Sequence, residues 1–336
     1  MKTETIDLGH GEGGRLTHEL IDRLFRRHFS NAYLDPLCDA AVLPGPGARI
    51  AFTTDSYVVQ PIFFPGGDIG KLAVCGTVND LSMVGAVPLY LTAGYILEEG
   101  MPYTDLERIV TSMAQAAREA GTVIVAGDTK VVGRGDADRV FINTAGIGWI
   151  PDGVDLSPEK VREGDRIIVS GSMGDHGMAI LCQREGLEFN TSLVSDCAPL
   201  NGLVETILSR HRGVRVMRDP TRGGLATALV ELARARGLGF EIEETSVPVH
   251  EGVRASCELL GLDVLYVANE GKLIAIVSPA DAEAVLRTLQ DHPLGRDAGI
   301  IGQVVEEHPN RVVLKTILGV KRVMDMLTGE QLPRIC

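Results

Sequence analysis

Five aspartates stand in apolar or glycine-rich stretches, where a charged side chain is unusual. They are Asp39, Asp55, Asp80, Asp128 and Asp219. Taken singly, a turn or a helix cap explains each of them better than a binding site does. A carboxylate beside a buried apolar run nevertheless needs a cation or hydrogen bonds, because desolvating its charge is costly. If the fold brings the five together, they form an all-oxygen cage that suits Mg²⁺ bound to the phosphates of ATP.

A glycine-rich arm near the start of the sequence is a second candidate. Residues 9–14 read Gly-His-Gly-Glu-Gly-Gly and precede a helical pattern. Glycines let main-chain amides approach a phosphate, and a helix N-terminus favours an anion. No clear strand precedes the arm, so a dinucleotide-binding fingerprint is not supported. A phosphate-covering loop and a mobile N-terminal arm both remain open.

The last residue of the sequence, Cys336, is a third candidate. A prenylation box needs its cysteine four residues from the end, so this motif is excluded. Residues 327–336 show no helical stripe, and ten extended residues reach at most about 35 Å. A mobile tail over 327–336 would carry a thiol into a neighbouring cleft and out again. An exposed cysteine without a function is the alternative.

Composition excludes several classes of protein. The 336 residues are 45% hydrophobic and 23% charged, which is the balance of a packed globular chain and not of a disordered one. A net charge of −13 and an aromatic content of 4% argue against nucleic acid and anionic membranes as partners. The six cysteines show no Cys-x-x-Cys pair, and the first residues resemble no signal peptide, so we expect a cytoplasmic protein without disulfides.

Strand and helix patterns alternate on both sides of a turn sequence, Pro-Asp-Gly, at 151–153. Before the turn, the pattern predicts strands at 50–59, 89–97, 123–126 and 140–150, and helices at 16–28, 68–86 and 104–121 with a capping box at Thr104 and Glu107. After it, we predict strands at 166–170, 214–217, 264–268, 273–278, 299–305 and 311–314, and helices from about 175 and at 200–210, 225–236, 251–261 and 280–289. Several strands follow one another directly, which favours an α+β fold with helices on one sheet face.

These motifs together resemble one family along essentially the whole chain. The resemblance rests on seven segments: the arm at 10–14, Thr-Thr-Asp-Ser at 53–56, Val-Asn-Asp-Leu at 78–81, Ala-Gly-Asp-Thr-Lys-Val at 126–131, Asp-Pro-Thr-Arg-Gly-Gly-Leu at 219–225, Asn-Glu-Gly at 269–271 and Pro-Arg-Ile-Cys at 333–336. They are similar to the HypE family of hydrogenase maturation factors, carbamoyl dehydratases of the PurM-like ATP-binding superfamily.

The resemblance implies a two-domain PurM-like fold. Residues 1–151 would form an N-terminal mixed-sheet domain that binds ATP and dimerises, and 152–326 a C-terminal α/β sandwich, followed by the flexible tail. The implied reaction is the ATP-dependent dehydration of an S-carbamoyl group on Cys336 to a thiocyanate, the source of the cyanide ligand of [NiFe] hydrogenase. The implied partners are the carbamoyltransferase HypF, the HypC–HypD complex and a second copy of the chain.

The family match also assigns roles to residues. Cys336 is the implied carrier, and Glu270 and Lys130 are implied to act beside the nitrogen that loses its protons, with Lys130 also able to bind phosphate. The expected metal ligands are the five aspartates named above, holding Mg²⁺. The expected nucleotide-binding residues are His10, Gly11, Gly13, Gly14, Thr54, Asn79, Thr129, Thr221 and Arg222. His176 is either phosphate-facing or structural.

Two other functions remain open. A small-molecule kinase or synthetase of the same superfamily would not use the tail, and a scaffold would bind ATP only to stabilise its shape. Related selenide-activating enzymes carry their reactive residue in the glycine-rich arm, which here reads Gly-Glu-Gly-Gly-Arg at 11–15. The reactive sulfur therefore moves, on this interpretation, to Cys336.

Overall fold

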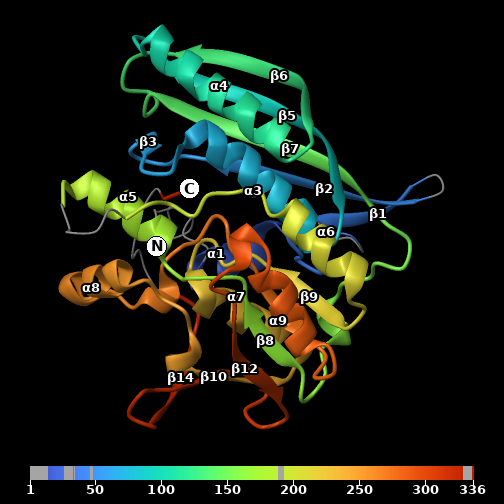
Figure 1. The fold of residues 1–336 in the computed structure, drawn as a ribbon. Helices are drawn as coiled ribbons and strands as arrows, with labels where there is room; N and C mark the ends of the chain where they lie inside the picture. The colour runs from blue at the N-terminus through green and yellow to red at the C-terminus, as the bar shows by residue number, and fades with distance from the viewer. Residues whose placement is uncertain (1–13, 26–32, 34, 46–47, 188–192, 328–334) are drawn as a thin grey trace.

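Two large sheets organise the chain, one in the upper and one in the lower half of Figure 1. The computed structural model describes residues 14–25, 33, 35–45, 48–187, 193–327 and 335–336. The first sheet has the strand order β1-β2-β7-β5-β6, and the second has the order β14-β13-β10-β12-β8-β11-β9. Each sheet therefore draws its strands from a separate half of the sequence.

The first sheet is covered on one face. Its strands are β1 (Ala41–Gly45), β2 (Ala48–Tyr57), β5 (Val87–Glu98), β6 (Val123–Val132) and β7 (Val140–Ile150), and its helices are α3 (Ile69–Met83) and α4 (Tyr103–Glu119). Along β7, Ile142 and Thr144 are buried against α3, whereas Asn143 and Trp149 point the other way and are exposed. This alternation leaves the far face of the sheet uncovered.

The second sheet is covered on both faces. Its strands are β8 (Arg166–Val169), β9 (Val214–Arg218), β10 (Gly239–Glu243), β11 (Ile274–Val277), β12 (Gly299–Val305), β13 (Val312–Lys315) and β14 (Lys321–Met324), and its helices are α5 (Asp175–Glu185), α6 (Asn201–Arg210), α7 (Gly224–Arg236), α8 (Glu251–Leu260) and α9 (Ala282–Gln290). On β11, Ile274 and Ile276 pack with α7, while Ala275 and Val277 pack with α6 and α9. The expectation of helices on one face only is therefore wrong for this sheet.

Several short elements complete the described chain. They are α1 (Arg15–Leu20), the π-helical turn η2 (Ile21–Phe25), the hairpin strands β3 (Phe63–Phe64) and β4 (Gly67–Asp68), and the 3₁₀ turns η3 (Pro158–Lys160), η4 (Glu244–Ser246), η5 (Val264–Tyr266) and η6 (Pro293–Gly295). In the part of the chain that the structure describes, no helix has the length and apolar character needed to cross a membrane.

Most long elements match their sequence patterns, but two predictions are wrong. The helix at 104–121 begins at Tyr103 after Pro102, and its N-cap makes no side-chain hydrogen bond, so the capping box does not form. The strand predicted at 264–268 is the turn η5, because the Asp263 side chain accepts a hydrogen bond from Leu265 N–H and caps a 3₁₀ helix there. Strands β1, β3, β4, β10 and β14 were not anticipated.

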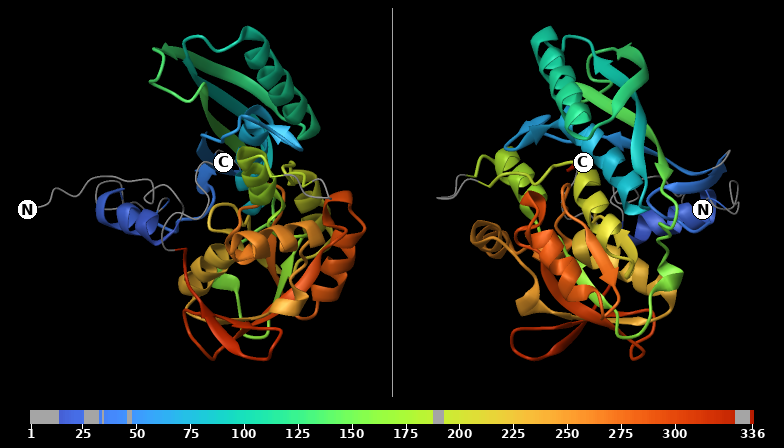
Figure 2. Two further views of the ribbon diagram at one scale, coloured as in Figure 1. Left: turned by 90° about the vertical axis from the view of Figure 1, so that its left-hand side faces the viewer. Right: turned by 45° about the vertical axis from the view of Figure 1, so that its right-hand side comes forward.

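The two halves meet around α3. This helix packs on β2 and β7 of the first sheet and also contacts α6 and β9 of the second half. The last two residues of the chain, Ile335 and Cys336, belong to the same buried cluster as residues of α3 and α5. Both ribbon views place the end of the chain between the two halves (Figures 1 and 2). The domain boundary at 151 stays a prediction.

A candidate active site between the two sheets

Four of the five predicted aspartates come together at the junction of the two halves. Asp55 lies in β2, Asp80 in α3, Asp219 directly after β9, and Asp39 just before β1. Burial, followed by the charges of Asp219, Asp55 and Asp39, raises the pKa of Asp80 well above its ordinary value. These carboxylates repel one another in a site with little water, so the cluster attracts cations.

The environment of Asp80 follows from an unusual helix. Nearly every residue of α3 is buried, so the helix is apolar on all sides and its few polar side chains must find partners inside the protein. The Thr53 hydroxyl from β2 donates a 2.9 Å hydrogen bond to Asp80 Oδ2. The second carboxylate, Asp219, has its pKa raised to about 8, first by burial and then by Asp39.

One arginine partly neutralises the cluster. The Arg218 guanidinium lies 3.4 Å from Asp39 Oδ1 and 2.6 Å from Glu231 Oε2, and Glu231 in turn lies 2.7 Å from His18 Nε2. These groups line a cavity of about 300 Å³ together with Thr221 and Arg222. The cavity is therefore lined by both carboxylates and guanidinium groups.

The loop that carries Thr221 and Arg222 needs its two glycines. Gly223 and Gly224 both have positive φ, 76° and 61°, at the start of α7. A Cβ on Gly224 would also lie 2.7 Å from the Leu265 carbonyl oxygen, so no larger residue fits. The turn into α7 keeps Arg222 at the cavity.

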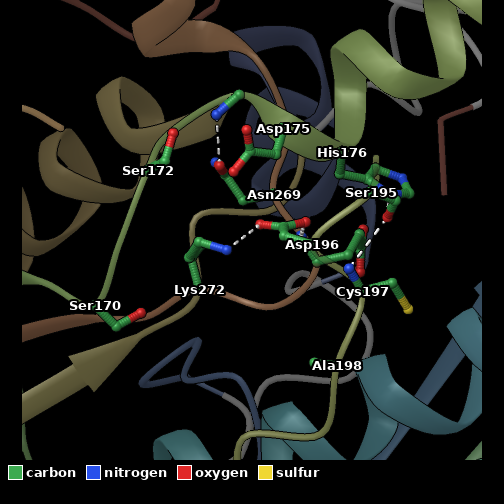
Figure 3. Close-up of polar contacts among 12 residues, drawn as sticks. Ser170, Ser172, Asp175, His176, Ser195, Asp196, Cys197, Ala198, Asn269 and Lys272 are labelled. Atoms are coloured by element: carbon green, nitrogen blue, oxygen red, sulfur yellow. Dashed lines mark hydrogen bonds and ion pairs between the residues drawn. The ribbon is translucent and has the colours of Figure 1, made fainter. Parts of the chain in front are cut away.

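Glu270 stands in a loop that several buried polar groups hold in place. Its side chain is 3% exposed, and burial raises the pKa of its carboxyl group well above the ordinary value, with Cys197 and Asp219 adding to the effect. The Glu270 N–H donates to Asp196 Oδ1 at 2.9 Å. The Lys272 ammonium lies 3.3 Å from Asp196 Oδ2, and Figure 3 shows these two side chains facing each other. Asp196 therefore holds the loop at two points, the main chain of Glu270 and the side chain of Lys272.

The neighbours of Glu270 complete this support. A Cβ on Gly271 would lie 1.8 Å from the Asp196 carbonyl oxygen, so the loop passes against the 193–198 segment only with glycine there. The Asn79 amide donates to the carbonyl oxygens of Glu270 and Ala198 and accepts from Leu200 N–H. Its hydrogen-bonding groups are thus used inside the protein, and the structure places this expected nucleotide ligand as a support of the loop.

Cys336 lies beside Glu270. The cysteine is 8% exposed, and burial raises the pKa of its thiol above the ordinary value; Arg222 opposes this shift, and a hydrogen bond to Glu270 adds to it. The same proximity raises the pKa of Arg222. A sulfur, a carboxyl group and a guanidinium thus meet at the edge of the acidic cavity, and the docked sulfur is held as a thiol.

Three of the expected residues lie away from the acidic cluster. Asp128, Thr129 and Lys130 are on the edge strand β6, and Asp128 is 72% exposed and paired with Lys130, itself 69% exposed, at 2.7 Å. Asp128 pairs with Gly94, which pairs with Asn143, which pairs with Ser56 of β2. Three strand spacings place it about 14 Å from β2.

The remaining expected residues also lie outside the acidic cluster or outside the described residues. The exposed Thr54 donates its hydroxyl to the Thr144 carbonyl oxygen, outside the acidic cluster. His10, Gly11 and Gly13 lie outside the described residues. Gly14 is described, and a Cβ there would lie 2.3 Å from the Leu327 carbonyl oxygen. His176 is fully buried and faces the end of the chain, so the phosphate-facing alternative is wrong for it.

Sequence reasoning did not single out Asp196, Arg218 or Ser195. No local signal marks the first and last, because both stand in an irregular segment and their partners are distant in sequence. Arg218 directly precedes Asp219, and an arginine next to a suspected metal ligand is a signal that was available.

The donor chemistry of the cluster fits a hard cation, although its geometry is not closed. Its acidic groups present only oxygens, which Mg²⁺ prefers. No group of three or more His, Cys, Asp or Glu side chains is close enough to hold a metal ion by itself in the described ranges. An ion here would have to take further oxygens from a phosphate ligand or from water.

Comparison with known proteins identifies the fold and the relatives of the chain. Residues 38–150 match the N-terminal domain and residues 162–315 the C-terminal domain of AIR synthase related proteins, which confirms the predicted PurM-like fold. A carbamoyl dehydratase HypE from Rhizobium leguminosarum bv. viciae is 54% identical over 98% of this chain and 95% of its own length.

Two solved structures are similar over nearly all of their length. The crystal structure of a HypE–HypF complex contains a chain that superimposes with a TM-score of 0.87 at 50% identity, covering 92% of this chain and 99% of that one. A hydrogenase maturation protein HypE in complex with ATP has a TM-score of 0.83 at 53% identity, covering 99% of this chain and 100% of that one.

Proposed function

The chain belongs to the HypE family of carbamoyl dehydratases, and we propose that it uses ATP to dehydrate an S-carbamoyl group on its own Cys336 to a thiocyanate. The observation that carries the proposal is the position of the buried Cys336, which lies beside Glu270 and Arg222, and Arg222 in turn lines the acidic cavity. A kinase acting on a free small molecule would have no use for a thiol at that place.

The reaction removes one oxygen and two protons from the carbamoyl group. The γ-phosphoryl group of ATP is transferred to the amide oxygen, the C–O bond breaks with release of phosphate, and the nitrogen loses both protons to give S–C≡N and ADP. Glu270 is placed to accept a proton, because a buried carboxylate with a raised pKa is a stronger base than an ordinary one. Arg222 is placed to hold the transferring phosphoryl group.

We propose that the acidic cluster binds the Mg²⁺ ion that accompanies ATP. Asp39, Asp55, Asp80 and Asp219 would hold Mg²⁺ through their carboxylates, and Thr221 lines a cavity together with Asp39 and Asp219. The ion would neutralise the charge of the phosphates where they approach these acids. The raised pKa values of Asp80 and Asp219 are in keeping with the assignment, since burial and then the neighbouring acids make ionisation costly there, and a bound cation would offset that cost.

We place Asp128, Thr129 and Lys130 in the site of a second copy of the chain. Strand β6 is exposed along nearly its whole length, and the uncovered face of its sheet carries large apolar side chains, among them Tyr90, Phe52 and Ile96. A homodimer formed through this face would bury them and carry Lys130 toward its partner. There it would bind phosphate or polarise the amide oxygen.

HypF is the proposed source of the carbamoyl group, on the strength of the solved complex of a similar chain. The docked Cys336 is buried and held as a thiol, so it is a poor nucleophile in this position. Carbamoylation therefore requires the sulfur to leave the pocket, and dehydration requires it to return. The HypC–HypD complex remains the proposed acceptor of the cyanide.

Intact-mass spectrometry tests the proposal directly. The chain is incubated with HypF and its carbamoyl donor, and the mass is recorded before and after addition of ATP and Mg²⁺. We expect a carbamoyl adduct that loses one water only when ATP is added, and no adduct on a Cys336→Ala variant. An adduct that keeps its mass with ATP, or product formation by the alanine variant, would refute the dehydratase.

A further inference from the structure

His176 makes two side-chain hydrogen bonds, one of them to the end of the chain. It lies in the first turn of α5 and is fully buried. Its Nε2 is 2.9 Å from the Ile335 carbonyl oxygen, and its Nδ1 is 2.7 Å from the Ser195 hydroxyl. Figure 3 shows His176 and Ser195 side by side above Cys197. Neither residue has a place in the chemistry proposed above.

The partners of this imidazole determine where its proton lies. A carbonyl oxygen only accepts, so Nε2 carries the hydrogen and donates to Ile335. Nδ1 then has a free lone pair, and the Ser195 hydroxyl must donate to it. The Ser195 oxygen in turn accepts the Cys197 N–H at 3.1 Å. Every donor has one acceptor, and the network has a single direction.

The last two residues are held from both halves of the protein. Ile335 is hydrogen-bonded to His176 of the second half, and the main-chain oxygen of Cys336 accepts a hydrogen bond from Val58 N–H, just after β2, at 3.4 Å. The Ile335 side chain is 5% exposed and belongs to the cluster that contains α3 residues. Because the bond to His176 precedes Cys336 by one residue, it fixes where the sulfur points.

We propose that His176, oriented by Ser195, is a positioning residue that receives the Ile335 carbonyl and so sets the Cys336 sulfur against Glu270. The catalytic use of the docked tail rests on the proposed function, whereas the contact between His176 and the tail does not. Phe64 contacts the imidazole edge-on, at 5.6 Å between ring centroids and 89° between planes, and keeps the ring from turning. The imidazole acts through the tail and touches no reacting atom.

Two substitutions at His176 distinguish the loss of its hydrogen-bond donor from the loss of its side-chain volume. In His176→Gln, the amide nitrogen is as many bonds from Cα as Nε2 is, so it keeps a donor for Ile335. In His176→Asn, the amide ends where Nδ1 lies, so the tail carbonyl loses its partner while Ser195 keeps one. Alkylation of Cys336 by iodoacetamide, read by peptide mass mapping, measures how often the sulfur leaves its pocket. The exposed Cys38 serves as the internal reference.

We expect Cys336 of His176→Asn to be alkylated about three to ten times faster than that of the wild type, the change in equilibrium expected for one lost hydrogen bond. His176→Gln should stay near the wild-type rate, and Cys38 should react equally in all three proteins. In single-turnover dehydration, the asparagine variant should slow much less than its alkylation accelerates, because a tail that is mostly docked stays mostly docked after such a change, and the apparent KM for ATP should stay unchanged.

Three outcomes would overturn the proposal. Wild-type alkylation of Cys336 in His176→Asn would show that the imidazole does not hold the tail. Equal acceleration in both variants, together with an equal fall in thermal stability, would show a packing role only. A Ser195→Ala variant with wild-type protection of Cys336 would remove the orienting role of the hydroxyl. Because alkylation needs no turnover, these results stand even if the chain proves not to be a dehydratase.

Discussion

Replacing Asp219 by asparagine would separate the stability of this site from its use in chemistry. The Asp219 carboxyl has its pKa raised from 3.8 to about 8, first by burial and then by the charge of Asp39. The folded chain therefore binds this proton more tightly than the unfolded chain does. It follows that ionisation of Asp219 progressively opposes folding as the pH rises from about 4 to about 8.

The magnitude follows from the two pKa values. At pH 7 the solution lies about three pH units above the pKa of Asp219 in the unfolded chain. Ionisation of that carboxyl in the unfolded chain therefore lowers the free energy of unfolding by at most about 4 kcal/mol. Asparagine cannot ionise, so this opposition to folding disappears, but it leaves a buried amide whose missing hydrogen bonds cost about 1–3 kcal/mol. We therefore expect Asp219→Asn to raise the free energy of unfolding by about 1–3 kcal/mol near neutral pH, and to give no gain near pH 5.

Urea unfolding of the nucleotide-free, Mg²⁺-free protein at about pH 5 and pH 8 measures this. The matched control is Asp128→Asn, because Asp128 is exposed and its pKa is lowered by a hydrogen bond from Lys130. The control should show no gain that grows with pH. If Asp219→Asn instead destabilised the protein equally at both pH values, the acidic cluster would not be the source of uncompensated charge that we infer.

Three further predictions concern catalysis. Glu270→Gln should slow dehydration by about a hundredfold or more while ATP binding persists, because it removes the base; a wild-type rate would assign the base elsewhere. Asp80→Asn should abolish ATP-dependent loss of water and hydrogenase maturation in cells, whereas continued maturation would favour the scaffold. A one-to-one mixture of Lys130→Ala and Glu270→Gln chains, dissociated and reassembled, should recover about a quarter of wild-type activity if Lys130 acts across a dimer; no recovery would place it in its own subunit's site.

The sequence predicted best those elements whose signal is local. Helix α3 was expected at 68–86 and observed at Ile69–Met83, because Asp68 caps it and its apolar run is long. Strand β12 was located to the residue. The segment at 264–268 was wrong because its apolar residues resemble a strand, while the deciding contact is the Asp263 cap. Strand β10, with two glutamates among its five residues, is set by pairing with β12 and β13, which no local pattern contains.

The residues of the candidate site also differ in whether a local sequence signal is enough to predict their surroundings. Asp80 and Asp219 were recognised because a carboxylate in an apolar stretch is anomalous within its own few residues. The expected role of Asn79 in binding nucleotide stays a prediction, and the fold adds that its amide supports the loops at 198–200 and 270. Asp128 carries the same local signal as Asp80, yet β6 is an exposed edge strand. A short motif shows that a polar residue is unusual, and only the fold shows what it faces.

The acidic cluster and the docked cysteine then follow from one physical arrangement. Three mutually repelling carboxylates, Asp55, Asp80 and Asp219, are placed where water is scarce, and the protein supplies few cations against them. Such a site is less stable empty than filled, so a nucleotide with its cation stabilises the folded chain by the repulsion it removes. The same scarcity of water keeps the Cys336 sulfur protonated and the Glu270 carboxyl basic. A dehydration needs this condition, because water in the pocket would favour the reverse reaction.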